Sequence, residues 1–101
     1  FLTLGSVFMD DEKHAVYVND QVCELTYKEY ELLKLLMSNA GIVTARDTIM
    51  ERIWGWDADA EINVVWVHIS NLRKKLRSIG ANVTIRASRG LGYILEEDHD
   101  Q

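Results

Sequence analysis

Hydrophobic residues recur at three- and four-residue steps in the stretch INVVWVHISNLRKKLR, residues 62–77. At about 100° per residue, Ile62, Val65, Ile69, Leu72 and Leu76 fall on one stripe of an α-helix. Most of the remaining positions are polar or basic. The pattern predicts a helix over residues 61–79, with one face against a core and the other open to a polar partner.

Two shorter helices are predicted before this one. Thr26 and Glu29 have the spacing of a capping box, which predicts a helix over residues 27–39. Thr44 is the expected N-cap of a second helix over residues 45–54, which Gly55 would end. The acidic stretch 56–61 has no periodicity and is read as a loop, with Asp57 or Asp59 as the N-cap of the long helix.

Short alternating runs at both ends of the chain predict strands. Before residue 26, runs at 2–4, 7–9, 14–18 and 21–25 predict an antiparallel sheet, with Asn19-Asp20 as a two-residue turn. Residues 83–87 and 91–95 predict a hairpin with Ser88-Arg89-Gly90 at its tip. The expected fold is α+β: a domain over residues 1–95 with an N-terminal sheet, three helices and a hairpin, and a frayed polar tail over 96–101.

Charge is strongly segregated along the chain. No Asp or Glu occurs in residues 62–95, although the chain as a whole has a formal net charge of −5. The segment contains six cations, which are Arg73, Lys74, Lys75, Arg77, Arg86 and Arg89. Such a run is often a plain solvated helix face, but the exclusion of acids favours contact with an anionic partner such as nucleic acid.

Other classes of function find little support in the sequence. No apolar run approaches the roughly 20 residues of a membrane span, and no signal peptide is recognisable, so a cytoplasmic protein without membrane contact is expected. The lone Cys23 fits a reducing compartment. His14, His68 and His99 lack metal-ligand spacing, and no catalytic constellation is present. We expect neither an enzyme nor a cofactor.

Two helices joined by a short connection and followed by a hairpin outline a winged helix-turn-helix. In this class the second helix of the pair enters the major groove of DNA, and the wing reaches a neighbouring groove. Both elements are the basic ones here. The alternative is a winged helix that binds protein, for instance RNA polymerase, which the acidic remainder and Trp66 keep open.

The segments ELTYKEYELLKLLMSNAGIVTARDTIMERIWG, VHISNLRKKL and RGLGY resemble, in this order, the OmpR/PhoB-type effector domain of bacterial two-component response regulators. The resemblance covers nearly the whole chain. It implies sequence-specific binding of double-stranded DNA and transcription regulation. A sensor histidine kinase would act only through a receiver domain, which is expected to be absent here. It also implies head-to-tail dimers on DNA, with the isolated domain a monomer.

The resemblance also implies candidate DNA contacts on three elements. On helix 61–79 these are Asn63, Val64, Val67 and Asn71, which face bases or the adjoining backbone, and His68, Arg73, Lys74 and Arg77 near phosphates, with Lys75 added by the clustered charge. Around the second helix they are Thr44, Arg46 and Trp54, although Trp54 is expected mainly in the core. On the wing 83–95, Arg89 matches an arginine that enters the minor groove. Residues 56–61 match a loop that can touch RNA polymerase.

Two positions depart from the family pattern. Trp66 stands where the family usually has Asp, and Ala87-Ser88 stand where Thr followed by an apolar residue is common. We expect Trp66 to pack against the loop at Trp56 and alter how the helix start approaches DNA. The missing hydroxyl at Ala87 removes one phosphate contact.

Overall fold

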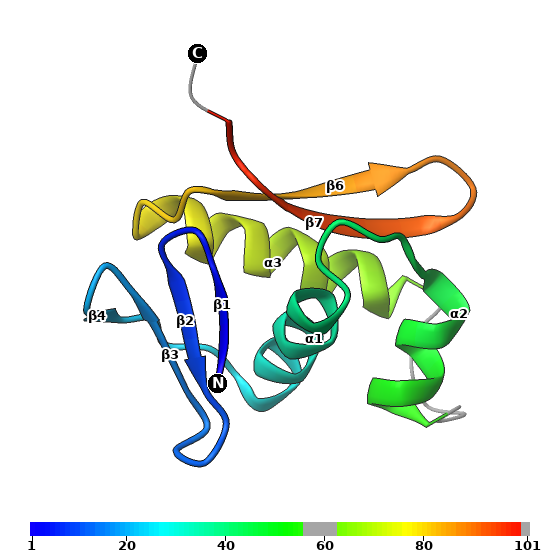
Figure 1. Ribbon diagram of the computed structural model, residues 1–101. Helices are drawn as coiled ribbons and strands as arrows, with labels where there is room; N and C mark the ends of the chain where they lie inside the picture. The colour runs from blue at the N-terminus through cyan, green and yellow to red at the C-terminus, as the bar shows by residue number, and fades with distance from the viewer. Residues whose placement is uncertain (56–62, 100–101) are drawn as a thin grey trace.

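The computed structural model describes residues 1–55 and 63–99 (Figure 1). A four-stranded antiparallel sheet comes first, followed by the helices, and a three-stranded sheet combines a short strand before α2 with the C-terminal hairpin. The first sheet has the order β1 (Leu2–Leu4), β2 (Val7–Asp10), β3 (Ala15–Val18) and β4 (Gln21–Val22). This element order is the predicted α+β arrangement.

The N-terminal sheet follows its hydrophobic alternation. Val7, Met9, Val16 and Val18 are buried, while their strand neighbours are more exposed. The Asn19-Asp20 turn between β3 and β4 has φ angles of 50° and 69°, so the predicted two-residue hairpin is confirmed. Strand β4 is shorter than predicted and ends at Val22.

Helix α1 (Tyr27–Ser38) starts with the predicted capping box. The Glu29 amide donates to Thr26 Oγ1 at 3.3 Å, and the Thr26 amide donates to Glu29 Oε1 at 2.9 Å. Tyr30, Leu33 and Leu36 lie on the buried face. In Figure 1, α1 lies between the N-terminal sheet and α2, with α3 behind it. It therefore packs at the centre of the domain.

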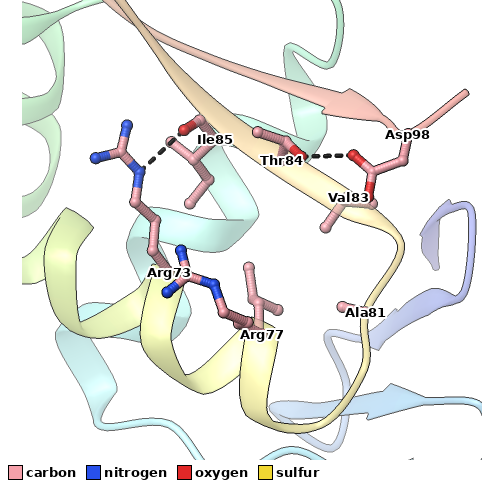
Figure 2. A pocket seen from close by; sticks show the side chains of 8 residues that line it. Arg73, Arg77, Ala81, Val83, Thr84, Ile85 and Asp98 are labelled. Carbon is pink, nitrogen blue, oxygen red and sulfur yellow. Dashed lines mark hydrogen bonds between the residues drawn. The ribbon is translucent and has the colours of Figure 1, made fainter.

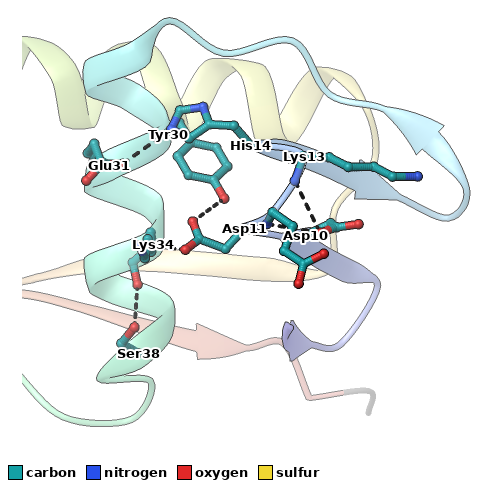
Figure 3. Close-up of polar contacts among 9 residues, drawn as sticks. Asp10, Asp11, Lys13, His14, Tyr30, Glu31, Lys34 and Ser38 are labelled. Carbon is teal, nitrogen blue, oxygen red and sulfur yellow. Dashed lines mark hydrogen bonds and ion pairs between the residues drawn. The ribbon is translucent and has the colours of Figure 1, made fainter.

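Polar contacts fasten the β2–β3 turn to α1 (Figure 3). The Tyr30 hydroxyl donates to Asp11 Oδ1 at 2.9 Å, and Lys34 Nζ donates to Asp11 Oδ2 at 3.0 Å. His14, at a φ of 53°, places its ring 3.6 Å from the Tyr30 ring, centroid to centroid. The hydrogen bonds from Lys34 and then Tyr30 lower the pKa of the Asp11 carboxyl.

The second helix starts differently from the prediction. Helix α2 (Arg46–Ile49) continues into a π-helical turn, η1 (Met50–Trp54), which ends at Gly55 with a φ of 58°. The expected N-cap at Thr44 is wrong: the cap position is Ala45, and no side chain caps the helix. Thr44 instead begins β5 (Thr44–Ala45) and pairs with Tyr93, which turns its side chain into the interior.

Helix α3 (Val64–Ser78) confirms the buried stripe. Val65, Ile69, Leu72 and Leu76 are at most 3% exposed. Its N-cap position is Asn63, without a side-chain hydrogen bond, so the expected cap at Asp57 or Asp59 is wrong. Residues 56–62, which include these acids and Ile62, lie outside the described part of the chain.

The C-terminal sheet has the order β5-β7-β6, with β6 (Val83–Ser88) and β7 (Gly92–Glu97) forming the predicted hairpin. The Leu91 amide donates to the Ser88 carbonyl at 2.9 Å, so Arg89 and Gly90 form the tip, with Gly90 at a φ of 72°. Strand β7 is longer than predicted because Glu96 and Glu97 pair with Thr84 and Val83. These two acids are therefore not part of a frayed tail.

The hairpin lies above α3, and its tip reaches the end of the molecule where α2 begins (Figure 1). The Arg46 amide donates to the Leu91 carbonyl at 3.2 Å, which joins the start of α2 to the base of the tip. Within residues 1–55 and 63–99, none of the helices has the length and apolar character needed to cross a bilayer.

Candidate nucleic-acid interface

The outward face of α3 presents most of the predicted contact residues. Asn63, Val67, Asn71 and Lys74 are exposed and follow one another at three- and four-residue steps, opposite the buried stripe. Arg77 is also exposed, one turn beyond Lys74. Val64 is half-buried at the first helical position. The helix therefore brings these side chains to one surface.

The six cations of the basic segment divide into two groups. Lys75 Nζ donates to Glu29 Oε1 at 2.5 Å, and Arg86 forms an ion pair with Glu96 at 3.0 Å. Arg73 Nε donates to the Ile85 carbonyl at 2.9 Å. Lys75 and Arg73 thus join α3 to α1 and to the hairpin, whereas Arg86 forms an exposed pair between the two strands of the hairpin. Sequence spacing gave no sign of these partners.

Glu29 gives Lys75 a structural role. Burial alone would raise the pKa of the Glu29 carboxyl, but hydrogen bonds from Lys75 and the Thr26 amide outweigh burial and lower it. The same carboxylate completes the capping box of α1. Lys75 therefore neutralises a buried charge on α1, and its ammonium group lies away from the outward face of α3.

The other three cations are the ones available to a partner. Lys74, Arg77 and Arg89 are exposed, and none has an ion pair or hydrogen bond to residues 1–55 or 63–99. Lys74 and Arg77 lie on α3, and Arg89 lies at the tip of the hairpin. Of the positive charge in the segment, this is the part that is exposed and without a partner in the described residues.

Arg73 connects α3 to the hairpin. Besides the bond from Nε to the Ile85 carbonyl, its guanidinium carbon lies 6.0 Å from the centre of the Tyr93 ring. Figure 2 shows Arg73 reaching from α3 toward Ile85, with Arg77 one turn further along the helix. Both arginines line a groove of about 200 Å³ between α3 and β6. The terminal nitrogens of Arg73 remain available for a further contact.

Trp54 and His68 pack against each other at the junction of η1 and α3. Their ring centroids are 4.9 Å apart at an interplanar angle of 72°. His68 Nδ1 lies 2.9 Å from the Val64 carbonyl, and Lys28 Nζ lies 5.9 Å from the centre of the Trp54 ring. Both rings are half-buried, as expected for Trp54. Their main role is to hold η1 against α3.

Thr44 and Arg46 lie in different environments. The Thr44 side chain is 5% exposed, and its hydroxyl has no hydrogen-bond partner among the described residues. It is buried in strand β5, beside β7 in the same sheet, whereas Arg46 is exposed at the start of α2. The expected contact through the Thr44 side chain is therefore not supported by its position.

Gly92 is a residue that the sequence alone did not single out. A Cβ atom at Gly92 would lie 2.0 Å from the Thr44 carbonyl oxygen, well inside any real contact distance. Only glycine allows β5 and β7 to approach this closely. The glycine-rich run RGLGY was the available signal, because an isolated glycine within a strand often marks a close backbone approach.

Trp66 is 56% exposed on α3. Its expected partner, Trp56, lies outside the described residues. Ala87 is exposed on β6 opposite Tyr93. Both positions that depart from the family pattern therefore lie at the surface beside the predicted contact residues.

Comparisons with known proteins agree with this geometry. A family model described as transcriptional regulatory protein, C terminal, matches residues 20–95. The response regulator protein PmrA of Pseudomonas aeruginosa is 38% identical over 96 residues, which cover 95% of this chain and 42% of PmrA. The sensory transduction protein RegX3 of Mycobacterium tuberculosis is 42% identical over 96 residues, covering 94% and 42%. The chain thus spans less than half the length of these relatives.

Solved structures show the same fold. The AdeR DNA-binding domain in complex with an intercistronic region is 28% identical, with a TM-score of 0.83, over 96% of this chain and 99% of that one. The Klebsiella pneumoniae RstA DNA-binding domain in complex with the RstA box is 27% identical, with a TM-score of 0.81, over 94% and 95%. The predicted winged helix-turn-helix fold is confirmed.

Proposed function

The chain belongs to the family of transcriptional regulatory protein C-terminal domains, as its resemblance to OmpR/PhoB-type effector domains predicted, and from this membership we propose that it binds double-stranded DNA sequence-specifically. In this proposal it regulates transcription as the output domain of a two-component response regulator. Two of its structural relatives were solved in complex with DNA, which supports the proposal.

In the proposed complex, α3 lies in the major groove. That groove is about 12 Å wide and accepts one α-helix with its side chains. The outward line from Asn63 through Val67 and Asn71 would then face the base edges. An asparagine amide can pair bidentately with adenine, so Asn71 is the first candidate for direct base recognition.

The exposed cations would contact the DNA backbone and the minor groove. Lys74 and Arg77 lie further along α3, where the helix leaves the groove and meets phosphates. Arg89, at the wing tip, would reach the neighbouring minor groove, where narrow A·T-rich tracts attract arginine. The bond from Arg73 Nε to the Ile85 carbonyl joins α3 to the wing, so one connected surface would contact both grooves.

The observation that carries this proposal is the separation of paired and unpaired cations. In the acid-free segment, three cations have a partner. Arg73 bonds to the Ile85 carbonyl, Lys75 pairs with Glu29, and Arg86 pairs with Glu96. Those without a partner in the described residues, Lys74, Arg77 and Arg89, are exposed on α3 and at the wing tip. Within this segment, the positive charge without an internal partner is therefore on the two elements that would contact DNA.

Further partners belong to the same proposal. The curated relatives are named as response regulators and are more than twice as long as the matched region, which supports coupling to a receiver domain and its sensor histidine kinase. We also propose a monomer in isolation and a head-to-tail pair on repeated DNA sites. A contact of residues 56–61 with RNA polymerase rests on the sequence resemblance, because this stretch lies outside the described residues.

Selection from random-sequence duplex DNA tests the proposal. Bound duplexes are sequenced, and the affinity of the wild type for the enriched site is compared with that of Asn71→Ala, Arg89→Ala and Arg86→Ala variants. We expect one enriched half-site and a loss of about tenfold in affinity for Asn71→Ala, within the range for a lost bidentate base contact. Arg89→Ala should also weaken binding.

Arg86→Ala is the matched control on the same hairpin, since Arg86 is already paired with Glu96. It should bind like the wild type. No binding to any duplex at low salt would contradict the proposal and favour the alternative, a winged helix that binds another protein.

A further inference from the structure

Trp66 is a large aromatic residue left open on the helix that we place in the major groove. It is 56% exposed, and within residues 1–55 and 63–99 its ring has no aromatic or cation-π partner. Trp54, in contrast, is half-buried against His68 and Lys28. The packing of the described domain therefore does not explain why Trp66 is a tryptophan.

The exposed surface of α3 changes character along the helix. From Asn63 to Asn71 it carries no formal charge apart from titratable His68, and the first turn has no acid. Besides His68, the exposed or half-exposed side chains of this part are Asn63, Val64, Trp66, Val67, Ser70 and Asn71. From Arg73 onward the surface is cationic. Phosphates would attract the cationic part from Arg73 onward. They offer no favourable contact to the apolar side chains between residues 63 and 71.

The major groove offers one apolar group to such a surface. Its base edges carry hydrogen-bond donors and acceptors except at thymine, which presents a 5-methyl group. We propose that Trp66 is a specificity-determining residue whose indole ring packs on a thymine methyl group in the major groove. This inference rests on the proposed function, because it requires α3 to bind DNA.

Helical geometry also places the thymine within the site. Trp66 shares one side of α3 with Ser70, Arg73 and Arg77, at steps of four, three and four residues. This side faces β6, because Arg73 donates to the Ile85 carbonyl. Trp66 therefore lies on the side of α3 nearer the wing, whereas Val67 and Asn71 lie on its outward face. The thymine should lie on the wing side of the base pairs that Asn71 contacts.

Replacing thymine by uracil tests the contact, since uracil lacks only the methyl group. Each thymine of the selected site is replaced in turn by deoxyuridine. The dissociation constant is then measured for the wild type and for Trp66→Ala, Trp66→Leu and Val22→Ala. Val22 is the matched control, an apolar residue that is 60% exposed on the N-terminal sheet. Circular dichroism verifies that each variant is folded.

For the wild type, replacing one thymine on the wing side by uracil should lower the affinity about fourfold. This is the factor that corresponds to the burial of one methyl group. Val22→Ala should show the same loss. Trp66→Ala should bind thymine and uracil equally at that position, and Trp66→Leu should keep part of the preference. The leucine variant decides the question should the alanine variant bind too weakly to measure.

The inference is overturned if the Trp66 variants lose the same factor as the wild type at every thymine. It is also overturned if the wild type binds tightly yet loses nothing at any position, while the proposed function survives both results. Failure of the wild type to bind any duplex would instead contradict the proposed function itself.

Discussion

Lys75 on α3 donates a hydrogen bond to the buried carboxylate of Glu29 on α1 over 2.5 Å, although 46 residues separate the two in sequence. Lys74, the preceding residue, is exposed and has no such partner among residues 1–55 and 63–99. Two identical, adjacent side chains thus have different roles: one stabilises the fold and the other faces outward.

Substituting Lys75→Met should destabilise the domain. It leaves the Glu29 carboxylate buried without its cation, which should lower the free energy of unfolding by about 1–2 kcal/mol. This value is smaller than for a fully buried charged hydrogen bond because the Lys75 side chain is 39% exposed. The free energy of unfolding from urea denaturation at pH 7 measures this. Lys74→Met is the matched control and should change it little.

The loss should also depend on pH. In the wild type the pKa of Glu29 is below its ordinary value of 4.5, so its contribution to stability is present above pH 4.5 and is lost as pH falls through the folded-state pKa. In Lys75→Met, burial without the lysine should raise that pKa. The stability difference between wild type and variant should therefore be largest near neutral pH and shrink below pH 4.5. A difference independent of pH would show that Lys75 acts through packing alone.

Gly92→Ala should disrupt the hairpin base. The added methyl group would meet the Thr44 carbonyl oxygen at 2.0 Å, and both atoms belong to paired backbone segments that cannot move apart without breaking β5 from β7. We expect a loss of at least about 3 kcal/mol, the upper end for overpacking. Gly90→Ala, which has open space around it but a φ of 72°, should cost only about 1–2 kcal/mol. Equal losses for the two variants would contradict this account.

Arg73→Lys should loosen the wing although it keeps the charge. Lysine has no Nε–H to donate to the Ile85 carbonyl, and it lacks the planar group that lies over Tyr93. Faster hydrogen exchange at amides of β6, with α1 amides unchanged, is the expected result. If β6 exchanged at the wild-type rate, Arg73 would not be what fixes the wing to α3.

Removing Lys34 should raise the pKa of Asp11. The Lys34 hydrogen bond is the largest cause of the lowered pKa, and the Tyr30 hydroxyl is the next. NMR titration of the Asp11 carboxyl in Lys34→Met should therefore show a pKa closer to its ordinary value of 3.8, and Tyr30→Phe should give a smaller shift in the same direction. Lys13→Met is the control, because Lys13 has no ion pair in the described structure. An unchanged pKa in Lys34→Met would contradict the contact.

Local sequence signals predicted much of the fold. The capping box of Thr26 and Glu29, the Asn19-Asp20 turn and the buried stripe of α3 each depend on residues within a few positions of one another, and all three are confirmed. Thr44 was predicted to cap a helix, but its backbone pairs with Tyr93 in a sheet and its side chain is buried. That pairing joins residues far apart in sequence, so no local pattern could reveal it.

The same limit applies to the candidate interface. Charge segregation along the sequence predicted the basic elements correctly, yet it could not distinguish Lys75 from Lys74 or Arg86 from Arg89. Their roles depend on Glu29 and Glu96, which become neighbours only through tertiary packing and hairpin register. Five cations of the segment were predicted contacts, namely Arg73, Lys74, Lys75, Arg77 and Arg89. The structure pairs Lys75 with Glu29 and bonds Arg73 Nε to the Ile85 carbonyl, and it leaves Lys74, Arg77 and Arg89 exposed without a partner among the described residues.

The salt dependence of DNA binding tests the central claim most directly. Affinity for the selected duplex is measured at several salt concentrations for the wild type, Lys74→Gln and Lys75→Gln. Each phosphate contact contributes about −0.9 to the slope of log affinity against log salt. Lys74→Gln should make the slope less steep by about one contact, while Lys75→Gln should leave it unchanged in folded protein. Equal changes for both lysines, or no salt dependence at all, would contradict an interface built from the outward face of α3.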